Sequence, residues 1–116
     1  MWVVCDRFAD STMAYQGYAL DGDRAAIAAL TEMLGIRPDL TLVLDVPVTT
    51  SVARLRGRGG EVDRYEQLGE DFFARTREGF RAIAAAEPGR CVLLDADRNE
   101  EEVADRVWRA VKRGLM

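Results

Sequence analysis

An aspartate and an arginine, Asp6 and Arg7, stand side by side directly after the apolar residues 2–5. An arginine guanidinium can bind a phosphate group through two parallel hydrogen bonds, whereas a lysine ammonium offers only a point charge. In open parallel sheets, ligands bind beyond the carboxyl ends of the strands. If residues 2–5 form such a strand, this pair is placed to bind a phosphorylated ligand.

Two further apolar runs, at 41–47 and 91–97, contain an aspartate near the expected strand end, Asp45 and Asp95. Three acidic side chains could therefore face one site at a common sheet edge. Aspartate is also an ordinary strand terminator and turn former. We favour that plain interpretation for Asp45, and the ligand-binding interpretation for Asp6 because Arg7 adjoins it.

A short helix with a polar face is expected after the Asp-Arg pair. Asp10 or Ser11 can cap it, and Thr12, Tyr15 and Gln16 then fall at helical spacing on one face. This face offers a hydroxyl, a phenol and a carboxamide, which suit the edge of a nucleobase and its sugar. Taken alone, the same residues are better explained by an exposed capping turn with a half-buried tyrosine.

A second cluster of chemistry-bearing residues lies in the stretch "ARLRGRGGEVDRYE" at 53–66. Arg54, Arg56, Arg58 and Arg64 are interspersed there with glycines. Arginines on a glycine-hinged segment could close over a polyphosphate and exclude water from it. The alternative is a flexible charged loop exposed to solvent.

The composition excludes several classes of function. The chain has no histidine, which removes Ser-His and Cys-His nucleophiles and the commonest metal ligand. A net charge of −4 argues against nucleic acid as a partner. No apolar run approaches the roughly 20 residues that span a membrane. With no leader-like segment and two cysteines, Cys5 and Cys91, that resemble buried free thiols, we expect a cytoplasmic protein.

The elements that must position these residues follow from the apolar pattern. The runs at 2–5, 41–47 and 91–97 are continuous rather than alternating, as in strands buried on both faces of a parallel sheet. Helical patterns separate them. One spans 23–35, with Asp23 as N-cap and a core-facing stripe of Ile27, Leu30, Met33 and Leu34; another spans 69–87. The last opens with Asn99 and Glu102, a capping-box-like pair. The alternation predicts a layered α/β fold.

Four blocks in register resemble the thymidylate (dTMP) kinase family: "DRF…S…AYQG", "LVLDVP…AR…R", "GGEVDRYEQ…FF.RTREGF" and "VLLDADRNEEEV". The resemblance covers the C-terminal half of that family's fold. It implies a three-layer α/β, P-loop nucleoside monophosphate kinase-like parallel sheet, here lacking the N-terminal strands and the phosphate loop. No G-x-x-x-x-G-K-[ST] string occurs in the sequence. Residues 1–116 would form one partial domain with a lid segment at about 54–66.

The resemblance also assigns roles to individual residues. Arg7 grips the phosphate of dTMP, Thr12 approaches the thymine edge, and Asp6 helps to organise the magnesium region through water, with no direct metal ligand in the chain. The implied catalytic residues are Asp6, Arg7, Arg54, Arg58 and Arg64. The implied dTMP-binding residues are Arg7, Ser11, Thr12, Tyr15 and Gln16. The implied ATP-binding residues are Arg54, Arg58, Asp95, Ala96, Asp97 and Arg98.

The function implied by the resemblance is phosphorylation of dTMP to dTDP in nucleotide biosynthesis, with ATP as co-substrate and Mg²⁺ as cofactor. The resemblance also implies that the full-length family member is a homodimer. Phosphoryl transfer to an ionised phosphate oxygen needs positioning and charge stabilisation rather than a histidine base. The chain alone is expected to be incomplete for catalysis. Two alternatives stay open: a deoxynucleoside kinase-like fragment, and a non-catalytic nucleotide-binding or interaction module.

Overall fold

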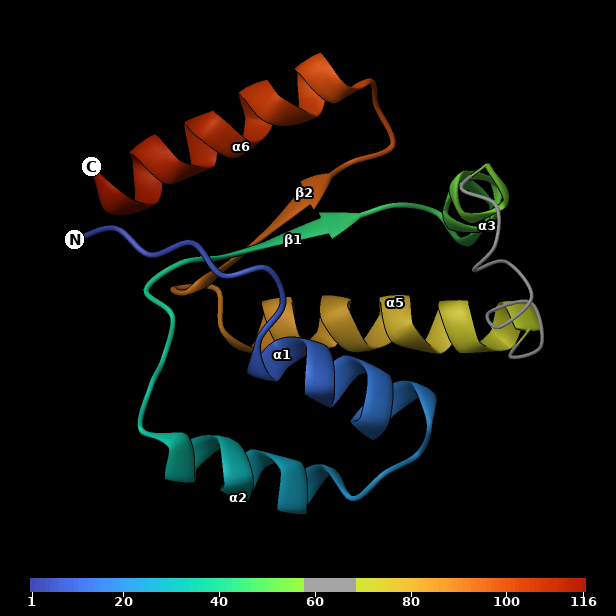
Figure 1. Ribbon diagram of the computed structural model, residues 1–116, viewed down its shortest axis with the longest axis vertical. Helices are drawn as coiled ribbons and strands as arrows, with labels where there is room; N and C mark the ends of the chain where they lie inside the picture. The colour runs from blue at the N-terminus through green and yellow to red at the C-terminus, as the bar shows by residue number, and fades with distance from the viewer. Residues whose placement is uncertain (58–68) are drawn as a thin grey trace.

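A computed structural model describes residues 1–57 and 69–116. It is a layered α/β structure in which a two-stranded parallel sheet lies between α6 on one side and α5 on the other, with α2 farthest from the sheet (Figure 1). The elements are, in chain order, α1 (Ala9–Thr12), the π-helix η1 (Met13–Ala19), α2 (Arg24–Leu34), β1 (Thr41–Asp45), α3 (Val48–Arg56), α5 (Gly69–Ala86), β2 (Cys91–Asp95) and α6 (Glu100–Leu115).

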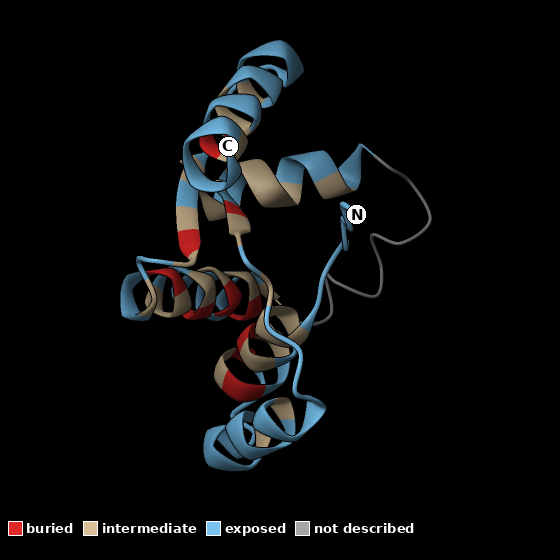
Figure 2. Cartoon of the chain, turned by 90° about the vertical axis from the view of Figure 1, so that its left-hand side faces the viewer, coloured by how far each residue is buried: buried red, intermediate tan, exposed pale blue. Residues whose placement is uncertain are grey.

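The two strands confirm the predicted parallel arrangement. They pair in register from Thr41 opposite Cys91 to Asp45 opposite Asp95, so both aspartates lie at the same carboxyl edge. Because side chains alternate between the two faces of a strand, alternate residues of each strand point towards α5. The core forms on that face, where Val43, Cys91 and Ala84 are buried and Phe80 and Ile83 pack against them. Figure 2 shows buried positions on the strands and on the helices beneath them.

The predicted strand at 2–5 is wrong. These residues form no strand, and Trp2, Val3 and Val4 are exposed. A strand needs a neighbour to pair its backbone hydrogen-bonding groups. In the part of the chain that the structure describes, β1 pairs only with β2, and no strand lies between β1 and residues 2–5. Cys91 is buried as expected, whereas Cys5 is exposed, because it lies in this unpaired segment.

Helix ends agree with the capping predictions for two helices. The Asp23 side chain accepts a hydrogen bond from the Ala26 amide at the start of α2, and Gly35 ends that helix with φ of 67°. Asn99 caps α6 by accepting from the Glu102 amide and donating to the Glu102 carboxylate. The expected core stripe of α2 is found only at Ile27, which is partly buried. Leu30, Met33 and Leu34 are exposed, because no described element covers that face.

The first helix is held differently from the prediction. It begins at Ala9 without a side-chain cap, and Asp10 instead accepts two hydrogen bonds from the Arg90 guanidinium, at 2.8 and 3.2 Å. Arg90 also donates to the Thr41 hydroxyl at 2.7 Å and to the Glu87 carboxylate. Its side chain is only 14% exposed. One guanidinium therefore joins α1, the start of β1 and the turn before β2.

Arg90→Met is expected to loosen α1. It leaves the carboxylate of Asp10 partly buried without its cation, whereas Glu87 keeps its ion pair with Arg37. Breaking a partly buried pair such as Arg90–Asp10 costs about 2 kcal/mol. The hydrogen-exchange rate of the Met13 amide measures the local opening of α1, because this amide donates to the Ala9 carbonyl. A loss of about 2 kcal/mol corresponds to roughly 30-fold faster exchange through local opening.

Arg109→Met is the matched control for this variant. Arg109 pairs with Asp105 on the surface of α6, where both side chains are more than half exposed, and such pairs contribute little to stability. Equal exchange rates at Met13 in the two variants would show that Arg90 does not hold α1.

Candidate functional site

The carboxyl edge of β1 is fastened to α5 through Asp45. Its carboxylate accepts two hydrogen bonds from Arg77, at 3.0 and 3.1 Å, and one from Arg81 at 2.9 Å. The hydrogen bond with Asp45 raises the pKa of Arg77 above its ordinary value. With its side chain 13% exposed and its oxygens occupied, Asp45 acts as a structural anchor.

The loop that follows β2 is held by its own first residue. The Asp95 carboxylate accepts from the Asp97 amide at 2.9 Å and from the Arg98 side chain at 3.2 Å. The hydrogen bond from the Asp97 amide is the largest cause that lowers the pKa of Asp95, and the hydrogen bond from Arg98 is the next. Residues 95–98 therefore form a closed turn directly before α6.

This turn is expected to depend on pH. Because the folded-state pKa of Asp95 is lowered, the turn is at full strength above the ordinary aspartate pKa of about 3.9 and weakens as the pH falls through the lower, folded-state value. The Asp97 amide chemical shift, followed by NMR between about pH 2 and 6, should report this titration. In an Asp95→Asn variant the same shift should stay flat; a titration that persists there would assign the proton to another group.

Helix α3 contacts this loop through two side chains that are four residues apart. Arg54 donates to the carbonyl oxygens of Ala96 at 3.0 Å and Arg98 at 3.4 Å. Thr50 donates its hydroxyl proton to the Asp97 carboxylate at 3.0 Å. The structure thus brings Arg54 together with the four residues 95–98. Sequence reasoning missed Thr50; its spacing of one helical turn from Arg54 is the signal that could have indicated it.

A second group of predicted residues meets at the start of the chain. Arg7 has a left-handed backbone with φ of 63°, and its guanidinium carbon lies over the Tyr15 ring, 5.1 Å from the centroid. The Tyr15 ring packs against Phe72 at 5.9 Å and edge-on against Phe80 at 6.0 Å. Asp6, beside Arg7, is exposed.

The expected common face of Thr12, Tyr15 and Gln16 is wrong for Tyr15. Residues 13–19 form a π-helix, in which the Leu20 amide donates to the Tyr15 carbonyl at 3.1 Å. A π turn holds more residues than an α turn, so a spacing of three no longer returns to the same side. Thr12 and Gln16 are exposed, Ser11 is partly buried, and Tyr15 turns towards α5.

The two groups are separate in the structure. Within the described ranges 1–57 and 69–116, no hydrogen bond or ion pair links Arg7 and Tyr15 to Arg54 or to residues 95–98. Arg58 and Arg64 lie outside the described residues.

The model of the thymidylate kinase family matches residues 1–107 of this sequence. The chain belongs to the thymidylate kinase family.

Individual thymidylate kinases agree with the family match. The one from Rhodopseudomonas palustris strain CGA009 is 48% identical over 119 residues, covering 99% of this chain and 52% of the relative. The one from Bradyrhizobium diazoefficiens is 43% identical over 120 residues, covering 100% of this chain and 53% of the relative. A crystal structure of thymidylate kinase from Ehrlichia chaffeensis superposes with a TM-score of 0.69 at 30% identity, covering 95% of this chain and 50% of that one.

These comparisons confirm the predicted family and its α/β fold class with a parallel sheet. The chain spans about half the length of the curated relatives it matches. That proportion agrees with a resemblance limited to one half of the thymidylate kinase fold.

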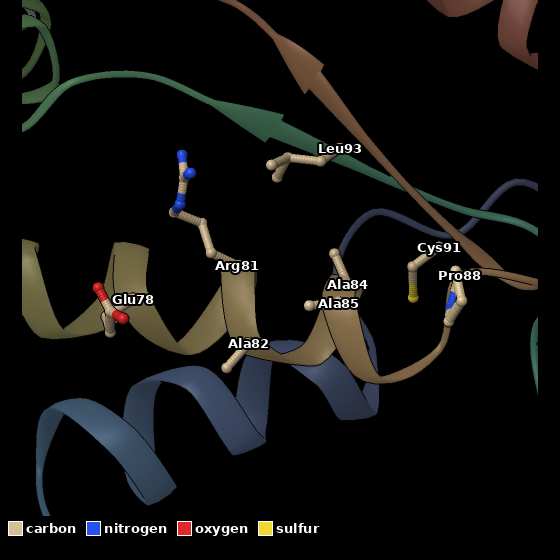
Figure 3. Close-up of a pocket in the computed structure, with 8 residues that line it drawn as sticks. All are labelled: Glu78, Arg81, Ala82, Ala84, Ala85, Pro88, Cys91 and Leu93. Atoms are coloured by element: carbon tan, nitrogen blue, oxygen red, sulfur yellow. The ribbon is translucent and has the colours of Figure 1, made fainter.

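A cavity of about 430 Å³ lies between α5 and β2 (Figure 3). Cys91 and Leu93 line it from β2, and Arg81 lines it from α5. Burial raises the pKa of the Cys91 thiol, which disfavours the reactive thiolate. None of the described residues assigned by the thymidylate kinase resemblance lines this cavity.

The described residues contain neither a metal-ligand cluster nor a helix that could span a membrane. Among the described residues, no three or more histidine, cysteine, aspartate or glutamate side chains gather where they could hold a metal ion. Within the same residues, every helix is too short or too polar to cross a membrane.

Proposed function

We propose that this chain carries the monophosphate side and the lid side of a thymidylate kinase, which transfers the γ-phosphoryl group of ATP to dTMP and produces dTDP for nucleotide biosynthesis. The observation that carries the proposal is the position of Arg7. Its guanidinium lies over an aromatic ring and makes no ion pair with a described carboxylate, so its hydrogen-bond donors remain available to an anion.

The residues around Arg7 suit a nucleoside monophosphate. In this proposal Arg7 grips the phosphate of dTMP, while the exposed side chains of Thr12 and Gln16 face the nucleoside with Ser11 beside them. Hydroxyl and carboxamide groups can match the donors and acceptors of a thymine edge. The acceptor oxygen of dTMP is already ionised near neutral pH, so the transfer needs no general base.

The residues on the ATP side form a loop with a fixed shape. Residues 95–98 are the proposed adenine-side loop, and the hydrogen bonds from Thr50 and Arg54 hold that loop to α3. Helix α3 leads directly into the proposed lid at about 54–66. Arg54 belongs to both parts, whereas Arg58 and Arg64, which the resemblance assigns to the lid, lie outside the described residues.

Mg²⁺ fits this proposal through water rather than through a protein cage. Asp6 has an exposed carboxylate beside Arg7, and Mg²⁺ is commonly bound by one or two carboxylates, waters and substrate phosphates. When bound, the ion neutralises charge that develops on the transferred phosphoryl group. The chain's own contribution is then to orient that region with Asp6 and to bind the acceptor phosphate with Arg7.

The phosphate loop has to come from outside these 116 residues in this proposal. The sequence contains no glycine loop to cradle the β- and γ-phosphates with backbone amides. We infer that residues 1–116 form one partial domain. We also infer that the complete protein is a cytoplasmic homodimer, as the resemblance to the thymidylate kinase family implies.

A chimera tests the proposed function. In the completed chimera, the N-terminal part of the Rhodopseudomonas palustris relative, up to the start of the match, is joined to residue 1 of this chain. With Mg²⁺ and ATP, it should release ADP in the presence of dTMP and not of thymidine. Turnover of thymidine instead would favour a deoxynucleoside kinase. A folded chimera that turns over neither would favour the non-catalytic module.

Arg54→Ala in the completed chimera should lower kcat and raise KM for ATP, with little change in KM for dTMP. The variant loses the hydrogen bonds to the Ala96 and Arg98 carbonyls and one lid arginine, and guanidinium groups that act in the transition state contribute mainly to kcat. Steady-state kinetics with each substrate varied will show this. An effect confined to KM for dTMP would place Arg54 at the monophosphate site instead.

A further inference from the structure

We propose that Tyr15 is a positioning residue: its ring holds the Arg7 guanidinium in place for the substrate phosphate, and the aromatic residues Phe72 and Phe80 of α5 fix that ring. The inference rests on the proposed function for the role of Arg7. It differs from the sequence-based assignment, in which Tyr15 itself belongs to the nucleoside-facing side chains.

The neighbours of the Tyr15 ring support a platform rather than a base-stacking role. The guanidinium of Arg7 lies over the ring, 5.1 Å from the centroid. Phe80 meets the ring edge-on at an interplanar angle of 84°, and Phe72 meets it tilted by 41°. A guanidinium over a tyrosine face is attracted by the negative charge of the π-system. This leaves little of the ring available to a nucleobase.

Arg7 differs in its partners from the three arginines that pair with carboxylates beside the sheet. Arg77, Arg81 and Arg90 each pair with a carboxylate, whereas Arg7 pairs with no described carboxylate. A contact with a ring face orients a guanidinium without using its five N–H donors as a carboxylate would. Arg7 is thus oriented while its donors stay available for a phosphate.

The backbone of Arg7 is set for this contact. Its φ of 63° lies in the left-handed region, which residues other than glycine seldom adopt and which occurs often at functional sites. The Cys5 thiol donates to the Arg7 carbonyl at 3.3 Å within the same bend. The bend lets Arg7 reach a ring eight residues further along the chain.

The place of Tyr15 is decided by α5. At Gly79 of α5, an added Cβ would lie 2.8 Å from the Cβ of Tyr18, so the glycine permits η1 to approach closely. The Phe72 side chain is buried in this interface. Phe72 and Phe80 pack against the Tyr15 ring, and the Arg7 guanidinium lies over that ring, so their effect on a phosphate would pass through Tyr15.

Two substitutions of Tyr15 separate a platform from a substrate contact. Tyr15→Phe keeps the ring and removes the hydroxyl, whereas Tyr15→Leu removes the ring. The first readout is the NMR shift of the Arg7 Hδ protons in the completed chimera, which a ring face moves upfield. The second is the Kd for dTMP by titration of the same chimera. We expect Tyr15→Phe to keep both, and Tyr15→Leu to lose the shift and weaken dTMP binding about two- to fivefold.

Phe80→Leu and a control complete the test. Phe80→Leu should reduce the upfield shift of Arg7 although it does not touch that side chain. Tyr18→Leu removes the same kind of contact from the same helix, because Arg24 lies 3.9 Å from the Tyr18 centroid. It should change neither the Arg7 shift nor the Kd for dTMP.

The outcomes distinguish this inference from the proposed function. A loss of dTMP binding in Tyr15→Phe as large as in Tyr15→Leu would overturn the inference, since the hydroxyl would then contact the substrate. The inference would also be overturned if the Arg7 Hδ protons had the same NMR shift in the wild type as in Tyr15→Leu. If the shift behaves as expected but the wild-type chimera binds no dTMP, the contact is supported and the proposed dTMP site is refuted.

Discussion

Arg7→Lys in the completed chimera is expected to lower kcat/KM for dTMP about 100-fold. The guanidinium of Arg7 is oriented by the Tyr15 ring and presents a planar set of donors that can grip a phosphate at two oxygens. A lysine ammonium keeps the charge but forms no such fork. A phosphate that is no longer held in line with ATP loses the positioning on which phosphoryl transfer depends.

Steady-state kinetics with dTMP varied at saturating ATP will measure the effect of Arg7→Lys. Arg109→Lys is the matched control, because Arg109 lies on α6, pairs only with Asp105 among described residues and is largely exposed. It should leave the kinetics unchanged. Wild-type kinetics in Arg7→Lys would remove Arg7 from the proposed site.

The 116-residue chain by itself is expected to unfold over a broad temperature range, to bind ATP weakly and to show no dTMP kinase turnover. The reason lies at the open edge of β1. Its backbone groups on that side pair with no described strand, and the apolar residues Trp2, Val3, Val4 and Leu44 are exposed. Each backbone group that is buried there without a partner costs roughly 1–3 kcal/mol. A strand that pairs with this edge would remove that cost.

Thermal melts and binding of a hydrophobic dye will test the isolated chain. Adding a polypeptide with the N-terminal half of a relative should sharpen the transition and reduce dye binding, because it can pair with β1 and cover the exposed side chains. A matched polypeptide with proline substituted in the pairing strand should not, since proline cannot donate to a strand. A cooperative melt with clear dTMP kinase turnover from the chain alone would refute this prediction.

Local patterns in the sequence were sufficient for several elements. Continuous apolar runs predicted β1 and β2 as parallel strands, which is confirmed, but the expected burial on both faces is not, because Leu44 and Leu93 are exposed. Asp23 and Asn99 marked the starts of α2 and α6, because capping involves residues only three apart. The adjacency of Asp6 and Arg7 and the four family blocks predicted the thymidylate kinase family, which the comparisons confirmed.

Contacts between distant segments could not be predicted in the same way. Arg90 meets Asp10 across 80 residues, and Arg54 meets the Ala96 carbonyl across 42. No local pattern encodes which of many arginines finds which distant acceptor.

The tertiary structure alone decided the state of residues 2–5 and the side of η1 on which Tyr15 lies. An apolar run such as 2–5 becomes a strand only when a neighbouring strand pairs with its backbone, so its sequence has a strand pattern while the segment stays unpaired. Tyr15 turns towards Phe72 and Phe80 because η1 is a π-helix packed on α5. Sequence thus determined the chemistry that this chain carries, and long-range packing determined how those groups are placed.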